Sequence, residues 1–297
     1  MARFGSVATA MVTPFDGAGQ VDFEEAGALA RWLVEQGNQG LIVAGTTGES
    51  PTLSHDEQTQ LFSVVKAAVT VPVVAGVGSN STRESLHLVE AANAAGVDGV
   101  LVVTPYYNRP SQAGLLEHFR AVAAATDLPV MLYDIPVRTG RKIDTATLLE
   151  LTRTTSNIVA LKDAAGDPAE TAKLISQAPE GFEVYSGDDS LTLPLLAVGA
   201  VGVVGVATHW CAADMVEMVE AHMKGDVERA RLLNARLIPS YEFETGVIAP
   251  NPVPTKALLR VLGRAVGECR SPMGPTPEGL EDRARALLAA LEAARAG

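Results

Sequence analysis

The stretch GVLVVTPYYNRPSQAGLLEHFRAVAAATDLPVMLYDIP, residues 99–136, contains the pattern that decides the fold. Its two ends, 99–105 and 128–136, are short runs in which nearly every residue is apolar, as expected for parallel strands that are buried on both faces. The segment between them, 112–125, repeats apolar residues at helical spacing. This order predicts a strand, a helix and a second strand parallel to the first.

Similar apolar runs recur along the whole chain, at separations of about 20 to 33 residues, which is the length of one strand and one helix. They begin at Val7, Gly40, Val71, Gly99, Leu128, Asn157, Phe182 and Gly202. Amphipathic segments of helical length lie between them, at 23–36, 56–69, 81–95, 112–125 and 144–154. Eight such units fit a closed barrel better than an open sheet, so the sequence predicts an α/β protein with a (β/α)8 TIM barrel.

The apolar runs stop near residue 224, and three further helical patterns follow at 227–239, 255–262 and 277–296. No Gly/Ser-rich linker precedes them, so we expect these helices to pack on the barrel and not to swing freely. The sequence therefore predicts a barrel over residues 1–224 and a C-terminal helical extension over 225–297.

The composition excludes several classes of protein. The 23 Lys and Arg and the 35 Asp and Glu among 297 residues give a net charge of −12, which would repel nucleic acid and anionic membranes. Cys211 and Cys269 lie too far apart for a disulfide framework or a cysteine-based zinc site. The uncharged run 190–213 contains Pro194 and three glycines and lacks flanking basic residues, so it does not suit a membrane span. Without a targeting segment, the chain is predicted to be cytoplasmic.

The active site of such a barrel forms at the carboxyl ends of its strands. Polar residues follow five of the predicted strands at that end, in the segments 45–50, 104–108, 133–139, 162–163 and 186–189. We expect them to face one common mouth. No nucleotide-binding motif or metal-ligand pattern accompanies them, so the sequence predicts neither a cofactor nor a metal.

Lys162 is the strongest candidate for a catalytic residue, because it is the one lysine of six that stands at the end of an apolar strand. The other five, Lys256 included, fit solvated positions. A barrel interior disfavours an ammonium and lowers its pKa, which leaves a free amine able to attack a carbonyl. The alternative is an ammonium that is paired with a neighbouring carboxylate such as Asp163.

Each polar neighbour of Lys162 also has two interpretations. Tyr133 and Tyr107 can pass protons to and from a Schiff-base intermediate, or they are packed aromatic residues with a solvated hydroxyl. Arg138 suits a carboxylate, although a surface arginine is the ordinary alternative. Thr46 and Thr47 offer hydroxyl and N–H groups to a second carboxylate, whereas a plain turn would explain only their flanking glycines.

Six motifs, in this order and at these separations, resemble the dihydrodipicolinate synthase family of pyruvate-dependent class I aldolases over nearly the whole chain: GTTGES (45–50), VTPYYNRP (103–110), YDIPVRTG (133–140), ALKDAAG (160–166), YSGDD (185–189) and PNPVPTKALL (250–259). The resemblance implies a lyase that condenses pyruvate with L-aspartate 4-semialdehyde to 4-hydroxy-tetrahydrodipicolinate, toward diaminopimelate and lysine. It implies no metal or organic cofactor, and a homotetramer built from two tight dimers.

The resemblance also assigns roles to matching residues. It makes Lys162 the Schiff-base lysine and Tyr133 the proton shuttle at its nitrogen. Thr46 and Tyr107 complete a proton relay, in which Tyr107 reaches into the neighbouring subunit's site. The remaining matches bind substrate: Thr47 holds the pyruvate carboxylate, Arg138 receives the carboxylate of the semialdehyde, and Gly187 and Val204 line the pyruvate pocket.

Two alternatives stay open beside this function. N-acetylneuraminate lyases and 2-keto-3-deoxy-gluconate aldolases share the lysine and tyrosine, but a pocket for a polyhydroxylated aldehyde would not place an arginine at position 138. A non-catalytic barrel that binds a keto acid would not need all of these residues together.

The resemblance extends to an allosteric site for L-lysine at the tight-dimer interface, where His55, Asn80, Glu84 and Tyr106 match. Pro51 and Gln58 depart from the family pattern there. The alternative is a polar dimer rim without an effector. Inhibition by millimolar L-lysine is the corresponding prediction.

Overall fold

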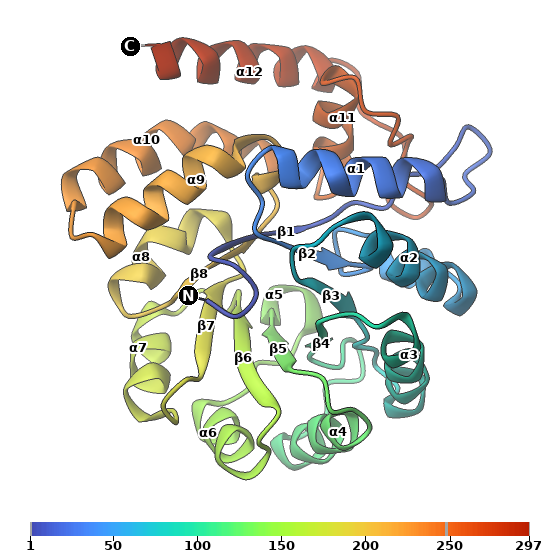
Figure 1. The fold of residues 1–297 in the computed structure, drawn as a ribbon, viewed down its shortest axis with the longest axis vertical. Helices are drawn as coiled ribbons and strands as arrows, with labels where there is room; N and C mark the ends of the chain where they lie inside the picture. Colours follow the sequence, from blue (N-terminus) through green and yellow to red (C-terminus); the bar gives the residue numbers. More distant parts are fainter. Residues whose placement is uncertain (1, 247–248, 297) are drawn as a thin grey trace.

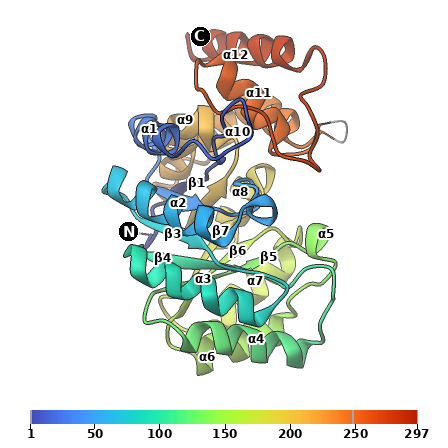
Figure 2. The ribbon, with the colours of Figure 1, turned by 90° about the vertical axis from the view of Figure 1, so that its right-hand side faces the viewer.

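The computed structural model of the chain describes residues 2–246 and 249–296. Eight parallel strands form a closed barrel in which each strand pairs with its sequence neighbours and β8 pairs with β1. Figures 1 and 2 show the helices surrounding this barrel. The predicted α/β barrel fold is confirmed. The strands are β1 (Val7–Ala10), β2 (Gly40–Val43), β3 (Val73–Gly76), β4 (Gly99–Val103), β5 (Val130–Asp134), β6 (Ile158–Asp163), β7 (Glu183–Ser186) and β8 (Gly202–Gly205).

The helices that follow the strands begin and end largely where the sequence predicts. Ser54 and Glu57 form a capping box at the start of α2, and Gly96, with φ of 68°, ends α3 in the left-handed conformation that glycine adopts freely. These helices are α1 (Phe23–Glu35), α2 (His55–Ala68), α3 (Thr82–Ala95), α4 (Gln112–Ala124), α5 (Pro136–Thr139), α6 (Thr145–Thr154), α7 (Pro168–Gln177), α8 (Thr192–Ala197) and α9 (Thr208–Met223), with short 3₁₀ turns η1 (Ser50–Thr52) and η2 (Asp189–Leu191).

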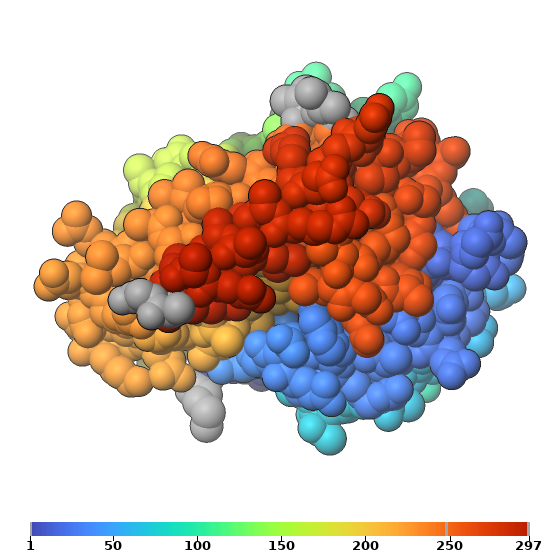
Figure 3. Space-filling view, turned by 90° about the horizontal axis from the view of Figure 1, so that it is seen from above, coloured from blue at the N-terminus to red at the C-terminus, as the bar shows by residue number. Residues whose placement is uncertain are grey.

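Three more helices complete the described chain: α10 (Val227–Glu244), α11 (Val253–Val261) and α12 (Leu280–Ala296). The expected end of α10 at Pro239 is wrong, because the helix continues through this proline to Glu244. Buried residues of α9 to α12 form one apolar cluster that includes Val7 of β1 and Val203 of β8. In the space-filling view, α12 crosses the outside of the molecule (Figure 3). The division of the chain at residues 224 and 225 stays a prediction.

The uncharged run 190–213 is divided among α8, β8 and the start of α9. In the described part of the chain, no helix has the length and apolar character that a membrane span requires.

The barrel interior and the layer outside it are separate cores. The interior cluster includes Ala8, Ile42, Leu101, Tyr133 and Ala160. Because side chains alternate along a strand, Lys162 lies on the same face of β6 as Ala160, two residues earlier. The strand period therefore directs the Lys162 side chain into the barrel.

Candidate active site

Lys162 lies inside the barrel, near the carboxyl end of β6. Its strand neighbours are Tyr133 of β5 and Tyr185 of β7. The Lys162 Nζ lies 4.3 Å from the centroid of the Tyr133 ring, and each of these two residues is 4% exposed. The amine and the phenol therefore share one dry environment at the mouth of the barrel.

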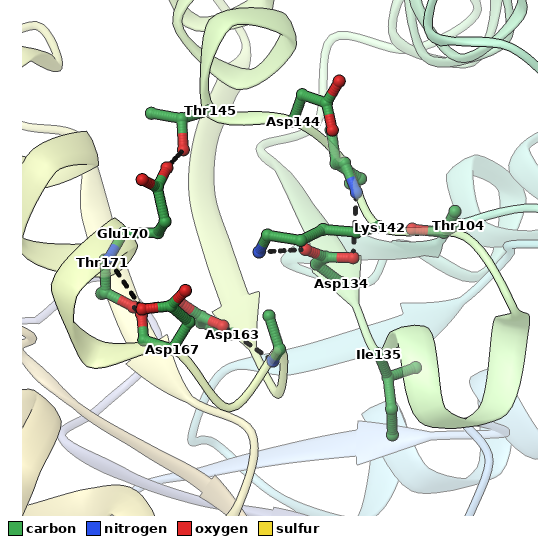
Figure 4. Close-up of polar contacts among 12 residues, drawn as sticks. Thr104, Asp134, Ile135, Lys142, Asp144, Thr145, Asp163, Asp167, Glu170 and Thr171 are labelled. Atoms are coloured by element: carbon green, nitrogen blue, oxygen red, sulfur yellow. Dashed lines mark hydrogen bonds and ion pairs between the residues drawn. The ribbon is translucent and has the colours of Figure 1, made fainter.

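The structure contradicts the alternative in which Asp163 holds the Lys162 ammonium. Asp163 points to the other face of β6, where its carboxylate accepts hydrogen bonds from the Ala165 N–H (2.9 Å) and the Thr171 hydroxyl (2.6 Å), as Figure 4 shows. Among residues 2–246 and 249–296, no carboxylate oxygen lies within 4.0 Å of the Lys162 Nζ. Within this described part of the chain, the amine is buried without an ion pair.

This environment changes the protonation of Lys162. Burial lowers the pKa of the amine from its ordinary 10.5 to about 8. The negative charge of Asp189 opposes this shift, the positive charge of Arg138 adds to it, and Glu244 opposes it. A substantial fraction of neutral amine is therefore present near physiological pH.

Asp134, the residue after Tyr133, anchors the end of β5 on the outer face of the sheet. Its carboxylate accepts hydrogen bonds from the Lys142 ammonium (3.3 Å) and from the Ile143 N–H (3.2 Å), also drawn in Figure 4. Burial raises the pKa of this carboxyl to about 6, against the opposing charge of Lys142. Asp134 and Asp163 occupy neighbouring positions on β5 and β6. Each carboxylate accepts hydrogen bonds from the segment that follows its own strand, and these bonds hold that segment against the strand end.

Tyr133 contacts the second predicted group, Thr46. Burial raises the pKa of the Tyr133 phenol above its ordinary range, while the charge of Arg138 and a hydrogen bond with the Thr46 side chain lower it. The phenol therefore stays protonated at neutral pH and can exchange a proton through the Thr46 hydroxyl.

Thr47, Gly187 and Val204 lie around the same interior. Thr47 is buried, and its hydroxyl accepts a hydrogen bond from the Asn251 side chain at 2.9 Å. A Cβ at position 187 would lie 2.9 Å from Lys162 Cγ, so glycine gives the lysine stem its space. Val204 is fully buried in β8 and belongs to the interior cluster.

A cavity of about 200 Å³ opens at Tyr133. Within the described chain its wall does not include Lys162, Thr47, Gly187 or Val204. Arg138, an exposed residue of α5, lines it together with Thr46 and Tyr133. Apolar side chains such as Leu101 and Ile135 form other parts of its wall. The cavity thus combines an apolar wall with one cation and several hydroxyl groups, which suits a small carboxylic acid.

Tyr107 is the predicted relay residue that this chain does not bring into its own cavity wall. Its side chain is 90% exposed, and its backbone has φ of 73°, which is uncommon for a residue with a Cβ. The Tyr107 N–H donates to the Thr139 carbonyl at 3.4 Å. The backbone therefore holds an aromatic side chain out from the barrel mouth.

The residues predicted to bind L-lysine lie in the segments that follow β2, β3 and β4, and two of them, His55 and Glu84, are in contact. His55 Nε2 lies 3.1 Å from Glu84 Oε2, and the Asn80 carbonyl accepts a hydrogen bond from the Asn108 side chain at 2.8 Å. Tyr106 lines the cavity described above. Glu84 is about one-third exposed, so its carboxylate is accessible to a charged ligand.

The expectation that Lys256 is solvated is wrong. Lys256 is fully buried, and its ammonium lies 2.8 Å from a carboxylate oxygen of Glu49, which is itself buried. Sequence reasoning also missed Asn251, the partner of Thr47. Both Asn251 and Lys256 stand in the motif PNPVPTKALL, and the polar residues of this otherwise apolar segment were the available signal.

The described architecture defines a class of protein before any comparison: an eight-stranded barrel with a buried, unpaired lysine beside a tyrosine at the catalytic end. Such an amine is the central feature of barrels that act through a lysine nucleophile. More narrowly, the chain belongs to the dihydrodipicolinate synthetase family, whose sequence model matches residues 3–291. The family predicted from the six motifs is confirmed.

Individual relatives cover nearly the whole chain. The chain is 50% identical to the 4-hydroxy-tetrahydrodipicolinate synthase of Moorella thermoacetica over 288 residues, which are 96% of this chain and 98% of that protein. It is 47% identical to the enzyme of the same name from Bacillus subtilis, over 93% of this chain and 95% of that protein.

Solved structures show the same similarity. The dihydrodipicolinate synthase from Bacillus anthracis superposes with a TM-score of 0.93 at 43% identity, over 97% of this chain and 99% of that chain. The enzyme from Cyanidioschyzon merolae, solved with lysine bound, has a TM-score of 0.95 at 43% identity, over 98% of this chain and 99% of that chain.

Proposed function

We propose that this protein condenses pyruvate with L-aspartate 4-semialdehyde to give 4-hydroxy-tetrahydrodipicolinate, in the biosynthesis of diaminopimelate and lysine. The observation that carries the proposal is the buried Lys162 amine, which has no ion pair in the described chain and has a lowered pKa. The relatives from Moorella thermoacetica and Bacillus subtilis support this substrate assignment through the enzyme that they are named for.

The reaction begins with attack of the neutral Lys162 amine on the ketone carbon of pyruvate. Loss of water leaves a protonated imine, which acidifies the methyl group, and loss of a methyl proton gives an enamine. The enamine carbon attacks the aldehyde carbon, whose oxygen takes up a proton to become the hydroxyl group. The amino group of the new chain then displaces Lys162 from the imine carbon and closes the ring.

The residues near Lys162 supply the proton transfers of this sequence. Tyr133 exchanges protons with the carbinolamine oxygen and with the imine nitrogen, and the Thr46 hydroxyl connects it to the next relay member. That member is Tyr107 of the neighbouring subunit, and the 90% exposed Tyr107 side chain supports this assignment.

Substrate binding is divided between the barrel interior around Lys162 and the cavity that Tyr133 and Thr46 line together with Arg138. Thr47 holds the pyruvate carboxylate, with Gly187 and Val204 as the adjacent wall. Arg138, on the exposed side, binds the carboxylate of the semialdehyde and orients its aldehyde toward the enamine. Arg138 disfavours a polyhydroxylated sugar acid as the acceptor, and the comparisons likewise favour the synthase over both alternatives.

The assembly that completes the site is a homotetramer of two tight dimers, located in the cytoplasm. The dimer within this assembly is supported by the site itself, because Lys162 lies inside and Tyr107 outside, so a second copy is needed to unite the two residues. Pyruvate and the semialdehyde are the partners of the tetramer.

A second proposal is regulation by L-lysine in the pocket of His55, Asn80, Glu84 and Tyr106. The solved relative from Cyanidioschyzon merolae with lysine bound supports it, as does the accessible Glu84 carboxylate, which would pair with a ligand amino group. Millimolar L-lysine is expected to lower the initial rate. Equal initial rates with and without saturating lysine would refute this proposal.

The central test is to trap the imine. The protein is treated with borohydride and pyruvate, and its mass and peptides are then mapped, with and without L-aspartate 4-semialdehyde. We expect one reduced pyruvate adduct, on Lys162, and its yield should fall when the semialdehyde is added before borohydride, because the enamine is then discharged. Lys162→Arg should lose the adduct, whereas Lys224→Arg, at an exposed lysine, should retain it. Folded protein without an adduct would contradict the proposed function, and discharge only by a sugar aldehyde would favour the sugar-acid alternative.

A further inference from the structure

Two carboxyl groups that the proposed mechanism does not use are buried together beside the barrel interior. Asp189 begins η2, after β7, and Glu244 is the last residue of α10. Asp189 is 2% exposed and Glu244 is 4% exposed. Acidic residues are rarely buried so deeply unless another polar group binds them. Here each carboxyl group is the neighbour of the other.

The hydrogen bonds around the two carboxyl groups require a proton between them. Asp189 Oδ2 accepts a hydrogen bond from the Val206 N–H at 2.8 Å. If both carboxyl groups were ionised, Asp189 Oδ1 and Glu244 Oε2 would have no donor among the residues that the structure describes. The two side chains lie within hydrogen-bonding reach of each other, and a carboxyl group donates only when it is protonated. The pair is therefore stable with one proton and one negative charge.

The proton belongs on Glu244. Burial and the neighbouring Asp189 charge raise the pKa of Glu244 well above its ordinary range. Burial also raises the pKa of Asp189, but the hydrogen bonds from Glu244 and from the Val206 N–H lower it. Asp189 thus accepts two hydrogen bonds and is the better site for the charge.

The pair lies next to the Lys162 end of the barrel. Asp189 is the first group that opposes the loss of charge on Lys162, and an ionised Glu244 would act in the same direction. Gly205 of β8 leaves the space for the Asp189 carboxylate, since a Cβ at that position would collide with Asp189 Oδ1. Glycine at position 187 does the same for the Lys162 stem. Two glycines therefore allow the amine and the carboxyl pair to approach the same interior wall.

The other ionisable groups near Asp189 and Glu244 do not provide a counter-charge for the Lys162 nitrogen in place of this pair. From the β7–η2 loop, Asp188 adds negative charge, and from α5, Arg138 adds positive charge toward Lys162. The Cys211 thiol of α9 and the Tyr241 phenol of α10 have pKa values that burial raises, so both are neutral. Asp214 of α9 is ion-paired with Arg295.

We propose that Asp189 and Glu244 share a single proton, carried by Glu244, and that the one negative charge of the pair balances positive charge on the Lys162 nitrogen. The inference rests on the proposed function, in which that nitrogen becomes a cationic imine. In the low-dielectric interior, the Asp189 charge stabilises the imine, while the proton on Glu244 prevents a second charge from holding the free lysine as an ammonium. Asp189 and Glu244 are positioning residues that act through Lys162.

The test first compares two substitutions that each replace a carboxyl group by an amide of the same size. Asp189→Asn removes the charge, whereas Glu244→Gln keeps a donor to Asp189. Glu242→Gln, at an exposed position of the same helix, is the matched control. Glu244→Leu removes the donor, which raises the pKa of Asp189 further and favours its neutral form. The readout is the pH dependence of Lys162 carbamylation by cyanate, mapped by mass spectrometry, because only the neutral amine reacts.

We expect Asp189→Asn and Glu244→Leu to move the midpoint of Lys162 labelling about one pH unit lower. Turnover with pyruvate should fall about tenfold, since one pKa unit of lost charge stabilisation corresponds to that factor. Glu244→Gln and Glu242→Gln should keep the parent midpoint.

Three results would overturn the proposal. If Asp189→Asn and Glu244→Leu both kept the parent midpoint of Lys162 labelling, the Asp189 charge would not act on Lys162. A shift in Glu244→Gln but not in Asp189→Asn would place the charge on Glu244. Equal shifts in both amide variants would point to a structural role. Because labelling by cyanate requires no substrate, it remains readable if pyruvate trapping fails, and Glu244→Leu provides the test if Asp189→Asn does not fold.

Discussion

Two of the six lysines are buried, and their surroundings give them opposite chemistry. Both ammonium groups lie over an aromatic ring, Lys162 over Tyr133 at 4.3 Å and Lys256 over Phe15 at 4.0 Å. Among the residues that the structure describes, a carboxylate at ion-pairing distance is found for Lys256 alone of the two, and it is that of Glu49. Burial lowers the pKa of both amines, but at Lys256 the adjacent charge opposes it and holds the ammonium. Lys162 is left as the reactive amine.

These two lysines also show what the sequence could predict about single residues. Lys162 could be found because it closes an apolar strand, so its burial follows from local pattern. Lys256 could not, because its partner Glu49 belongs to a loop that is distant in sequence. The same limit applies to Asp189 and Glu244, which meet only when α10 packs beside η2.

The pH dependence of the proposed reaction follows from the pKa of Lys162, about 8 in the folded protein. The attacking species is the neutral amine, so kcat/KM for pyruvate should rise with pH, about tenfold per unit below pH 8, and level off above it. Arg138→Met should move the midpoint upward, because the Arg138 charge lowers the pKa of Lys162. The measurement is kcat/KM for pyruvate from pH 6 to 10. A profile that is flat across pH 8 would contradict an amine nucleophile with this pKa.

At the scale of elements, α11 and the segments beside it hold the loop that follows β2. Asn251 donates to the Thr47 hydroxyl, and Lys256 pairs with Glu49 in the same loop. The Arg270 N–H donates to the second Glu49 oxygen at 2.9 Å. The loop that carries Thr46 and Thr47 is therefore fixed from the C-terminal part of the chain, not by the barrel strands alone.

The sequence predicted the repeating units well and this attachment poorly. Apolar runs and helical spacing are local, so all eight strands were found. Pro239 was expected to end α10, because proline lacks a backbone donor and clashes with the preceding turn. The helix continues because Leu237, Tyr241 and Phe243 are buried on both sides of the proline, and their packing outweighs that local cost.

Lys256→Met tests the attachment. The substitution leaves the Glu49 carboxylate buried without its counter-ion, and breaking a buried pair in this way costs about 3–5 kcal/mol. We expect the free energy of unfolding, measured in urea, to fall by that amount. Lys224→Met is the matched control at an exposed lysine paired with Glu220, and it should change the free energy by less than about 0.5 kcal/mol. Similar small losses in both variants would show that the Lys256 pair does not hold the loop.

At the scale of the whole molecule, one chain folds a complete barrel, but it holds Tyr107 of the proposed relay apart from Tyr133 and Lys162. Lys162 and Tyr133 lie inside, whereas Tyr107 extends outward from the loop after β4. In a two-fold symmetric dimer, each Tyr107 that enters a partner's site is matched by the reverse contact. Each site would then contain Lys162 from one subunit and Tyr107 from the other.

This arrangement predicts that two inactive variants restore each other. Lys162→Arg lacks the nucleophile and Tyr107→Phe lacks the relay hydroxyl, so each alone should be nearly inactive. In a mixed dimer, one of the two sites receives an intact Lys162 and an intact Tyr107. Random reassociation makes half of the dimers mixed, so about one quarter of the parental activity should return.

The matched control combines Lys162→Arg with Tyr133→Phe, two changes within the same subunit's site. Every site in that mixture carries one of the two defects, so no activity should return. Differently tagged subunits, separated after refolding together, give the mixed dimers directly, and their initial rate with pyruvate and the semialdehyde is compared with that of the parent. Mixed dimers of Lys162→Arg and Tyr107→Phe that form but stay inactive would mean that Tyr107 serves its own subunit or none, and that the exposed tyrosine has another cause.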